Sequence, residues 1–107
     1  MNTNEFLQKY SSYRSTATYK MKILAPIMKL ADGFTMSVQA SRFHYCSPRI
    51  DIGPYLSVEI GFPSAVEPLI MKYAETPESP TGTVYGYVPV EVVDAVIEKH
   101  GGIKDVK

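Results

Sequence analysis

Disulfide bonds and long apolar runs are both missing from this sequence, and each absence excludes a class of protein. Cys46 is the single cysteine, so the chain has no internal disulfide, as is typical of proteins from a reducing compartment. No apolar run approaches the roughly 18 residues that a membrane-spanning helix needs. The N-terminus also lacks the basic start and apolar stretch of a secretion signal. We therefore predict a cytoplasmic protein with no membrane partner.

Net charge is also lacking, because 11 Lys and Arg residues balance 11 Asp and Glu residues. An overall attraction to nucleic acid is therefore absent, and we do not expect nucleic acid as a partner. The distribution is uneven: residues 1–49 carry seven basic and two acidic residues (net +5), and residues 50–107 carry nine acidic and four basic ones (net −5). Either these charges interleave when strands pair, or the C-terminal half presents an acidic surface to a basic partner.

Apolar residues make up 45% of the chain and aromatic residues 11%, which is typical of a globular protein. A chain of 107 residues is long enough to bury one core. We expect a single domain over residues 18–103, with an N-terminal helical segment over 1–17 and a tail over 104–107.

Alternation of apolar and polar residues predicts the strands. The dipeptide Asp32-Gly33 lies between two extended runs, over residues 18–30 and 34–41, and favours a tight hairpin turn. A further strand is expected over residues 55–62, and another over 83–88. In the first of these, one face carries Leu56, Val58, Ile60 and Phe62.

Helical spacing and capping residues predict three helices. A weak apolar stripe covers residues 4–13. Ser64 and Glu67 fit a capping box that opens a helix. Pro89 fits the first position of a last helix, which ends at Gly101.

These elements predict an α+β fold, in which an antiparallel sheet of about four strands has two C-terminal helices on one face and a short N-terminal helix. Because two helices cover only one face of such a sheet, we expect the other face to stay partly open. That open face would present Ser37, Gln39, Ser57, Glu59, Tyr85 and Tyr87.

The densest group of chemically versatile residues is the segment RFHYCSPRIDIGPY, residues 42–55. Arginine offers a planar fork for carboxylates and phosphates, and tyrosine offers a rigid ring with a polar tip, so such a loop is suited to recognition. We predict a binding site formed by this loop and the open face. Its residues are Arg42, His44, Tyr45, Arg49, Asp51, Tyr55, Tyr85 and Tyr87.

Catalytic and metal sites are less well supported. Cys46 with His44 as its base would resemble a thiol nucleophile, but no group that orients the base can be identified. The spacing of His44, Cys46, Asp51 and His100 matches no zinc pattern. Phosphate-binding glycine motifs are absent. We predict no catalytic residue, no metal and no cofactor.

Three stretches, FTMSVQASRFHYCSPR, YLSVEIGFPS and VYGYVPVEVVDAVIEKHGG, resemble small accessory proteins of tailed bacteriophages and prophages. The resemblance covers roughly residues 27–103, and no established activity comes with it. It implies expression inside an infected bacterium and an effector that blocks a host protein, including components of antiviral defence.

Our hypothesis is therefore a phage-type binding protein that inhibits or modulates a bacterial host protein. One alternative is a sequestering binder of a nucleotide-like small ligand, with Arg42 and Arg49 on its phosphates and a tyrosine on its base. A second alternative is a small enzyme that depends on Cys46 and His44. The sequence does not decide whether the protein forms a homo-oligomer.

Overall fold

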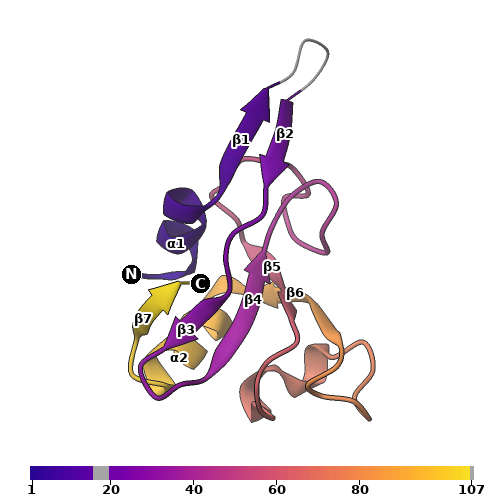
Figure 1. Ribbon diagram of the computed structural model, residues 1–107. Helices are drawn as coiled ribbons and strands as arrows, with labels where there is room; N and C mark the ends of the chain where they lie inside the picture. The colour runs from indigo at the N-terminus through magenta and orange to yellow at the C-terminus, as the bar shows by residue number, and fades with distance from the viewer. Residues whose placement is uncertain (16–19, 107) are drawn as a thin grey trace.

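The computed structural model describes the backbone of residues 1–15 and 20–106 and the side chains of residues 1–11 and 24–104. The fold is α+β, as predicted, and its centre is an antiparallel sheet of five strands in the order β6-β5-β4-β3-β7 (Figure 1). The strands are β3 (Met28–Leu30), β4 (Thr35–Gln39), β5 (Ser57–Gly61), β6 (Val84–Pro89) and β7 (Ile103–Val106).

The β3–β4 hairpin confirms the turn predicted at Asp32 and Gly33. Gly33 adopts a φ of 96°, which glycine reaches at no steric cost. The Asp32 carboxylate accepts a hydrogen bond from the Phe34 amide at 3.0 Å, and this fixes the turn. Alternate residues beyond the turn are buried, as predicted: Phe34, Met36, Val38 and Ala40.

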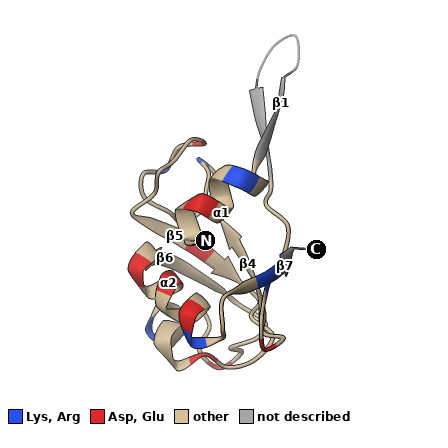
Figure 2. Cartoon of the chain, turned by 90° about the vertical axis from the view of Figure 1, so that its left-hand side faces the viewer, with Lys and Arg blue, Asp and Glu red and all other residues tan. Residues whose placement is uncertain are grey.

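Helices α1 (Thr3–Tyr10) and α2 (Val90–Lys99) lie on the same side of the sheet (Figure 2). The backbone amide and hydroxyl of Thr3 both donate to the Asp94 carboxylate, at 2.8 and 2.5 Å, and so join the two helices. The buried side of α2 is formed by Val93, Val96 and Ile97. No helix within residues 1–15 and 20–106 has the length and apolar character needed to cross a membrane.

The helix expected to open at Ser64 is instead a short 3-10 helix, η1 (Pro68–Tyr73). Proline disfavours the helical conformation in the residue before it, and Glu67 accordingly has an extended backbone with φ −123° and ψ 105°. The Ser64 hydroxyl is used elsewhere, as an acceptor for the Thr35 amide at 2.9 Å. Only α2 is therefore a C-terminal α-helix, and the prediction of two such helices was wrong.

The ends of the chain differ from the expected helical segment 1–17 and tail 104–107. Helix α1 ends at Tyr10, and β1 (Ser12–Ser15) then pairs with β2 (Lys20–Ile23) in a hairpin apart from the main sheet (Figure 1). At the other end, Gly101 and Gly102 adopt φ angles of 91° and 93° and turn the chain back, so that β7 pairs with β3. Residues 16–19 and 107 lie outside the described residues.

The ends of β5 also differ from the prediction. Val58 and Ile60 are fully buried, as expected. Leu56 and Phe62, which were expected on the same face, are 71% and 59% exposed. The Leu56 amide donates to the carbonyl of Ser47 at 2.7 Å, which draws it into the adjoining loop. Phe62 has a φ of 48°, so the alternation ends before it.

The open face of the sheet is smaller than predicted. Gln39 is buried because its side-chain amide bonds both backbone polar groups of Ala25, at 2.8 and 3.0 Å, and brings that segment over the sheet. Ser57 is buried where it bridges to Ser47 in the loop. Ser37 and Glu59 remain partly accessible, as expected.

An ionic cluster around the buried Glu67 joins η1, α2 and the β3–β4 turn. The imidazole of His100 lies between two carboxylates, with Nδ1 2.5 Å from Asp32 Oδ2 and Nε2 2.7 Å from Glu67 Oε1. Lys99 Nζ donates to the other oxygen of Glu67 at 2.9 Å. The ring of Phe34 stacks on the imidazole at 4.3 Å. Three elements distant in sequence are thereby tied together.

The ionisation of this cluster follows from its geometry. Burial opposes a charged His100, but the hydrogen bonds to Glu67 and Asp32 outweigh it and raise the pKa of His100 above 6.5. Burial likewise opposes a charged Glu67, but bonds from the Leu69 amide, His100 and Lys99 lower the pKa of Glu67 below 4.5. Bonds from the Phe34 amide and His100 lower the pKa of Asp32. The charged forms are therefore favoured together.

Placing a carboxylate in the core tests the fold. Val58→Asp and Val93→Asp each introduce it at a fully buried position. An unpaired buried charge costs several kcal/mol against a total stability of about 5–15 kcal/mol, so we expect both variants to unfold or to melt far below the wild type. Ala95→Asp, on the exposed side of α2, is the matched control and should melt normally. Wild-type melting of both core variants would refute the assigned core.

The ionic cluster predicts how stability depends on pH. His100, with its raised pKa, stabilises fully below pH 6.5 and loses this contribution as the pH rises through the higher folded value. Glu67, with its lowered pKa, stabilises the fold fully above pH 4.5. It loses this contribution to stability as the pH falls through the lower pKa of the folded state. We expect the highest melting temperature between these pH values. In His100→Gln the decline above pH 6.5 should disappear; an unchanged decline would contradict the pairing.

Candidate functional site

The candidate site begins with an irregularity in β6. Val58 pairs with Val88 and Ile60 pairs with Tyr85, so the two residues Gly86 and Tyr87 lie opposite the single residue Glu59. This is a β-bulge, which re-aims side chains. Tyr85 is fully buried and Tyr87 is 51% exposed. The prediction that the two tyrosines share the open face was therefore wrong for Tyr85.

The backbone at Tyr87 is strained. Its φ is 52°, in the left-handed region, which costs a residue with a Cβ about 1–2 kcal/mol. The Tyr87 amide donates to the carbonyl of Tyr45 at 2.9 Å and ties the loop to the strand. A Cβ at position 86 would lie 3.2 Å from the Tyr45 Cβ, so glycine at that position allows the close approach. Sparsely populated backbone of this kind is concentrated at functional sites.

We term five exposed residues near the bulge the aromatic–arginine cluster: Arg42, Phe43, Tyr45 and Arg49 of the loop and Tyr87 of β6. The rings of Tyr45 and Tyr87 are 6.0 Å apart at 38°. The Arg49 guanidinium lies 5.4 Å above the Tyr45 ring, and the Arg42 guanidinium lies 5.0 Å above the Phe43 ring. All five residues are exposed, Phe43 the most at 74%. The sequence analysis missed Phe43, because a lone phenylalanine there carries no pattern.

Two carboxylates hold the loop in place beneath this cluster. Glu59 Oε1 accepts the Tyr45 amide at 3.1 Å. Asp51 Oδ1 accepts the Arg42 amide at 2.9 Å, and its other oxygen lies 3.7 Å from Arg42 Nε. Asp51, which we predicted as a binding residue, therefore positions Arg42 in this structure.

The side chains of Tyr55 and His44 form hydrogen bonds with residues of the loop and of its start. Tyr55 is buried, and its hydroxyl donates to the carbonyl of Ile50 at 2.9 Å. The side-chain amide of Asn4 bonds both the backbone amide and the carbonyl of Tyr55, at 2.8 and 3.0 Å, and so ties the loop to α1. His44 Nδ1 lies 2.6 Å from the Ser41 hydroxyl. Tyr55, which we predicted as a binding residue, is therefore buried and anchors the loop in this structure.

The Cys46 side chain is not accessible from the surface. The thiol is buried and donates to the carbonyl of Ser41 at 3.2 Å. Residues 44–46 are not part of a strand, and His44 Nδ1 lies against the Ser41 hydroxyl. Among the described residues, no group of three or more His, Cys, Asp or Glu side chains is placed to hold a metal ion.

A cavity of about 340 Å³ lies between α1 and the same loop. It is lined by Asn4, Leu7, Gln8, Ser11 and residues 51–55. Neither Arg42 nor Arg49 is among these lining residues. Among the described side chains, the cavity therefore has no cationic lining group of the kind that the nucleotide-like ligand requires.

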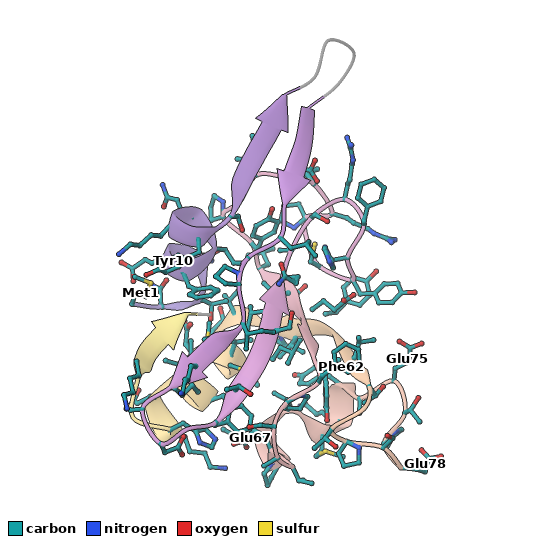
Figure 3. All side chains as sticks on the ribbon, in the orientation of Figure 1. Met1, Tyr10, Phe62, Glu67, Glu75 and Glu78 are labelled. Carbon is teal, nitrogen blue, oxygen red and sulfur yellow. The ribbon has the colours of Figure 1, made fainter. Side chains whose placement is uncertain are left out.

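Further apolar residues are exposed at the C-terminal end of the loop and directly after it. Ile50, Ile52 and Leu56 are each more than half exposed. Another exposed aromatic residue, Phe62, lies on the side of the molecule opposite Met1 and Tyr10 (Figure 3).

Comparison with known proteins found no match for this chain among protein-family models, curated proteins or solved structures. The resemblance to phage accessory proteins stays a prediction. Any functional conclusion rests on the site itself.

The burial of Cys46 predicts that its thiol is dispensable. Serine is nearly isosteric, and its hydroxyl can make the hydrogen bond that the thiol gives to Ser41. We expect Cys46→Ser to keep partner binding, with a small fall in melting temperature. Loss of function in a variant that remains folded would instead support the enzyme hypothesis.

Proposed function

We propose that the protein is a small binding protein that inhibits or modulates a bacterial host protein, including a component of antiviral defence, through the aromatic–arginine cluster. The observation that carries this proposal is Tyr87, an exposed tyrosine in the left-handed region at a β-bulge, whose ring lies 6.0 Å from that of Tyr45. Glycine or asparagine would satisfy that backbone with less strain. The tyrosine is therefore better explained by what its ring contacts than by the fold.

The composition of the cluster supports protein binding. Tyrosine and arginine are enriched among the residues that dominate binding energy at protein interfaces. Arg49 over Tyr45 is held by a cation–π contact, so little side-chain freedom is lost when a partner binds.

The class of partner comes from the sequence. The resemblance over residues 27–103 implies action in the cytoplasm of an infected bacterium, and the absence of net charge gives no preference for nucleic acid. The alternative of a nucleotide-like ligand would need Arg42 and Arg49 on its phosphates and a tyrosine on its base. Arg42 instead lies over Phe43 beside Asp51, and Arg49 lies over Tyr45.

Capture of partners by matched variants tests this proposal. Wild type, Tyr87→Asn and Phe62→Asn are purified from bacterial cells, and retained molecules are identified by native mass spectrometry. We expect the wild type to retain a host protein and Tyr87→Asn to bind it about thirtyfold more weakly, the effect of a hot-spot truncation of about 2 kcal/mol. Its melting temperature should shift by only a few degrees, because relief of strain offsets the lost Tyr45–Tyr87 contact.

Phe62→Asn is the matched control, because Phe62 is also an exposed aromatic residue with a positive φ, of 48°. It should retain the partner. Equal retention by Tyr87→Asn would reject the cluster as the site. Retention of a small molecule in place of a protein would favour the sequestering alternative, and self-association alone would favour a homo-oligomer.

A further inference from the structure

We propose that the segment of the partner that occupies the aromatic–arginine cluster is acidic and apolar, with a carboxylate on Arg49 and an apolar side chain against Tyr45 and Tyr87. This inference rests on the proposed function and names the chemistry of the partner. It follows from the state of each charged group around the cluster.

Arg49 is the cation of the cluster without an acidic partner among the described side chains. Arg42 has Asp51 beside it, at 3.7 Å between Nε and Oδ2. Glu59 accepts the Tyr45 amide and forms no salt bridge with a described basic side chain. The Arg49 guanidinium is exposed and lies over the face of Tyr45.

The position and exposure of Arg49 determine what it can bind. Its guanidinium carbon lies 5.4 Å from the centre of the Tyr45 ring and the residue is exposed, so N–H donors of its planar group are accessible to a partner. Two parallel donors on one edge match the two oxygens of a carboxylate. The Tyr45 and Tyr87 rings beside it offer apolar area at low entropic cost. The surface therefore fits a carboxylate that is flanked by an apolar side chain.

Other occupants fit less well. A cationic segment would be repelled by Arg49. A nucleic acid needs several basic groups to neutralise successive phosphates, whereas this cluster offers Arg49 and an Arg42 already placed beside Asp51.

Selection from a random-peptide display library on the full-length protein tests the inference. We expect enriched peptides in which Asp or Glu neighbours Leu, Ile or an aromatic residue. A synthetic peptide of the enriched sequence should bind Arg49→Gln about tenfold or more weakly than wild type, as expected for a lost charge-assisted hydrogen bond. Arg49→Lys should recover only part of this loss, because lysine lacks the planar fork. Added salt should weaken binding to wild type more than to Arg49→Gln.

The variants separate failure of this inference from failure of the proposed function. Peptides that lose binding to Tyr87→Asn but not to Arg49→Gln would leave the cluster as the site and overturn its acidic partner. Enrichment of basic peptides, or of none, would also overturn the inference. A host protein that binds wild type, Tyr87→Asn and Arg49→Gln equally would reject both proposals.

Discussion

The arrangement of the site depends on one constraint, that Tyr85 and Val88 both belong to the core although they lie three positions apart on one strand. Strict alternation along a strand would send one of them to the opposite face. The bulge at Gly86 and Tyr87 adds one residue opposite Glu59 and keeps both inside. Tyr87 is consequently directed outward, and its amide holds Tyr45 at the surface. Packing of the core thus creates the cluster.

The loop that carries the cluster is irregular but well anchored. On one side, Tyr87 and Glu59 bond the backbone of Tyr45. On the other, Asn4 of α1 bonds both backbone groups of Tyr55, whose hydroxyl bonds Ile50. A loop fixed at both ends loses less conformational freedom when a partner binds. The N-terminal helix therefore helps to anchor the loop, although none of its residues belongs to the cluster.

Features that depend on local sequence could be predicted. The alternation in β4 and the Asp32-Gly33 turn each follow from adjacent residues, as does the last helix with its apolar side. Arg42, Tyr45 and Arg49 of the predicted recognition loop are exposed, and their role in binding stays a prediction.

Features that depend on distant pairing could not be predicted. Whether Tyr85 or Tyr87 faces outward depends on the register with β5, although a glycine within a strand, Gly86, was a signal for a bulge. Glu67 was predicted to form a capping box with Ser64. Its side chain instead binds Lys99 and His100, which lie more than thirty residues away in the sequence.

The bulge and the cluster both depend on the positive φ of Tyr87, and the sign of this angle can be measured directly. In a nuclear Overhauser spectrum of the free protein, a positive φ gives a strong contact between the amide and α protons of Tyr87 itself. We predict this contact together with ring-to-ring contacts between Tyr45 and Tyr87, and slow exchange of the Tyr87 amide bonded to Tyr45. A weak intraresidue contact typical of an extended strand, with a rapidly exchanging amide, would contradict the bulge and the site built on it.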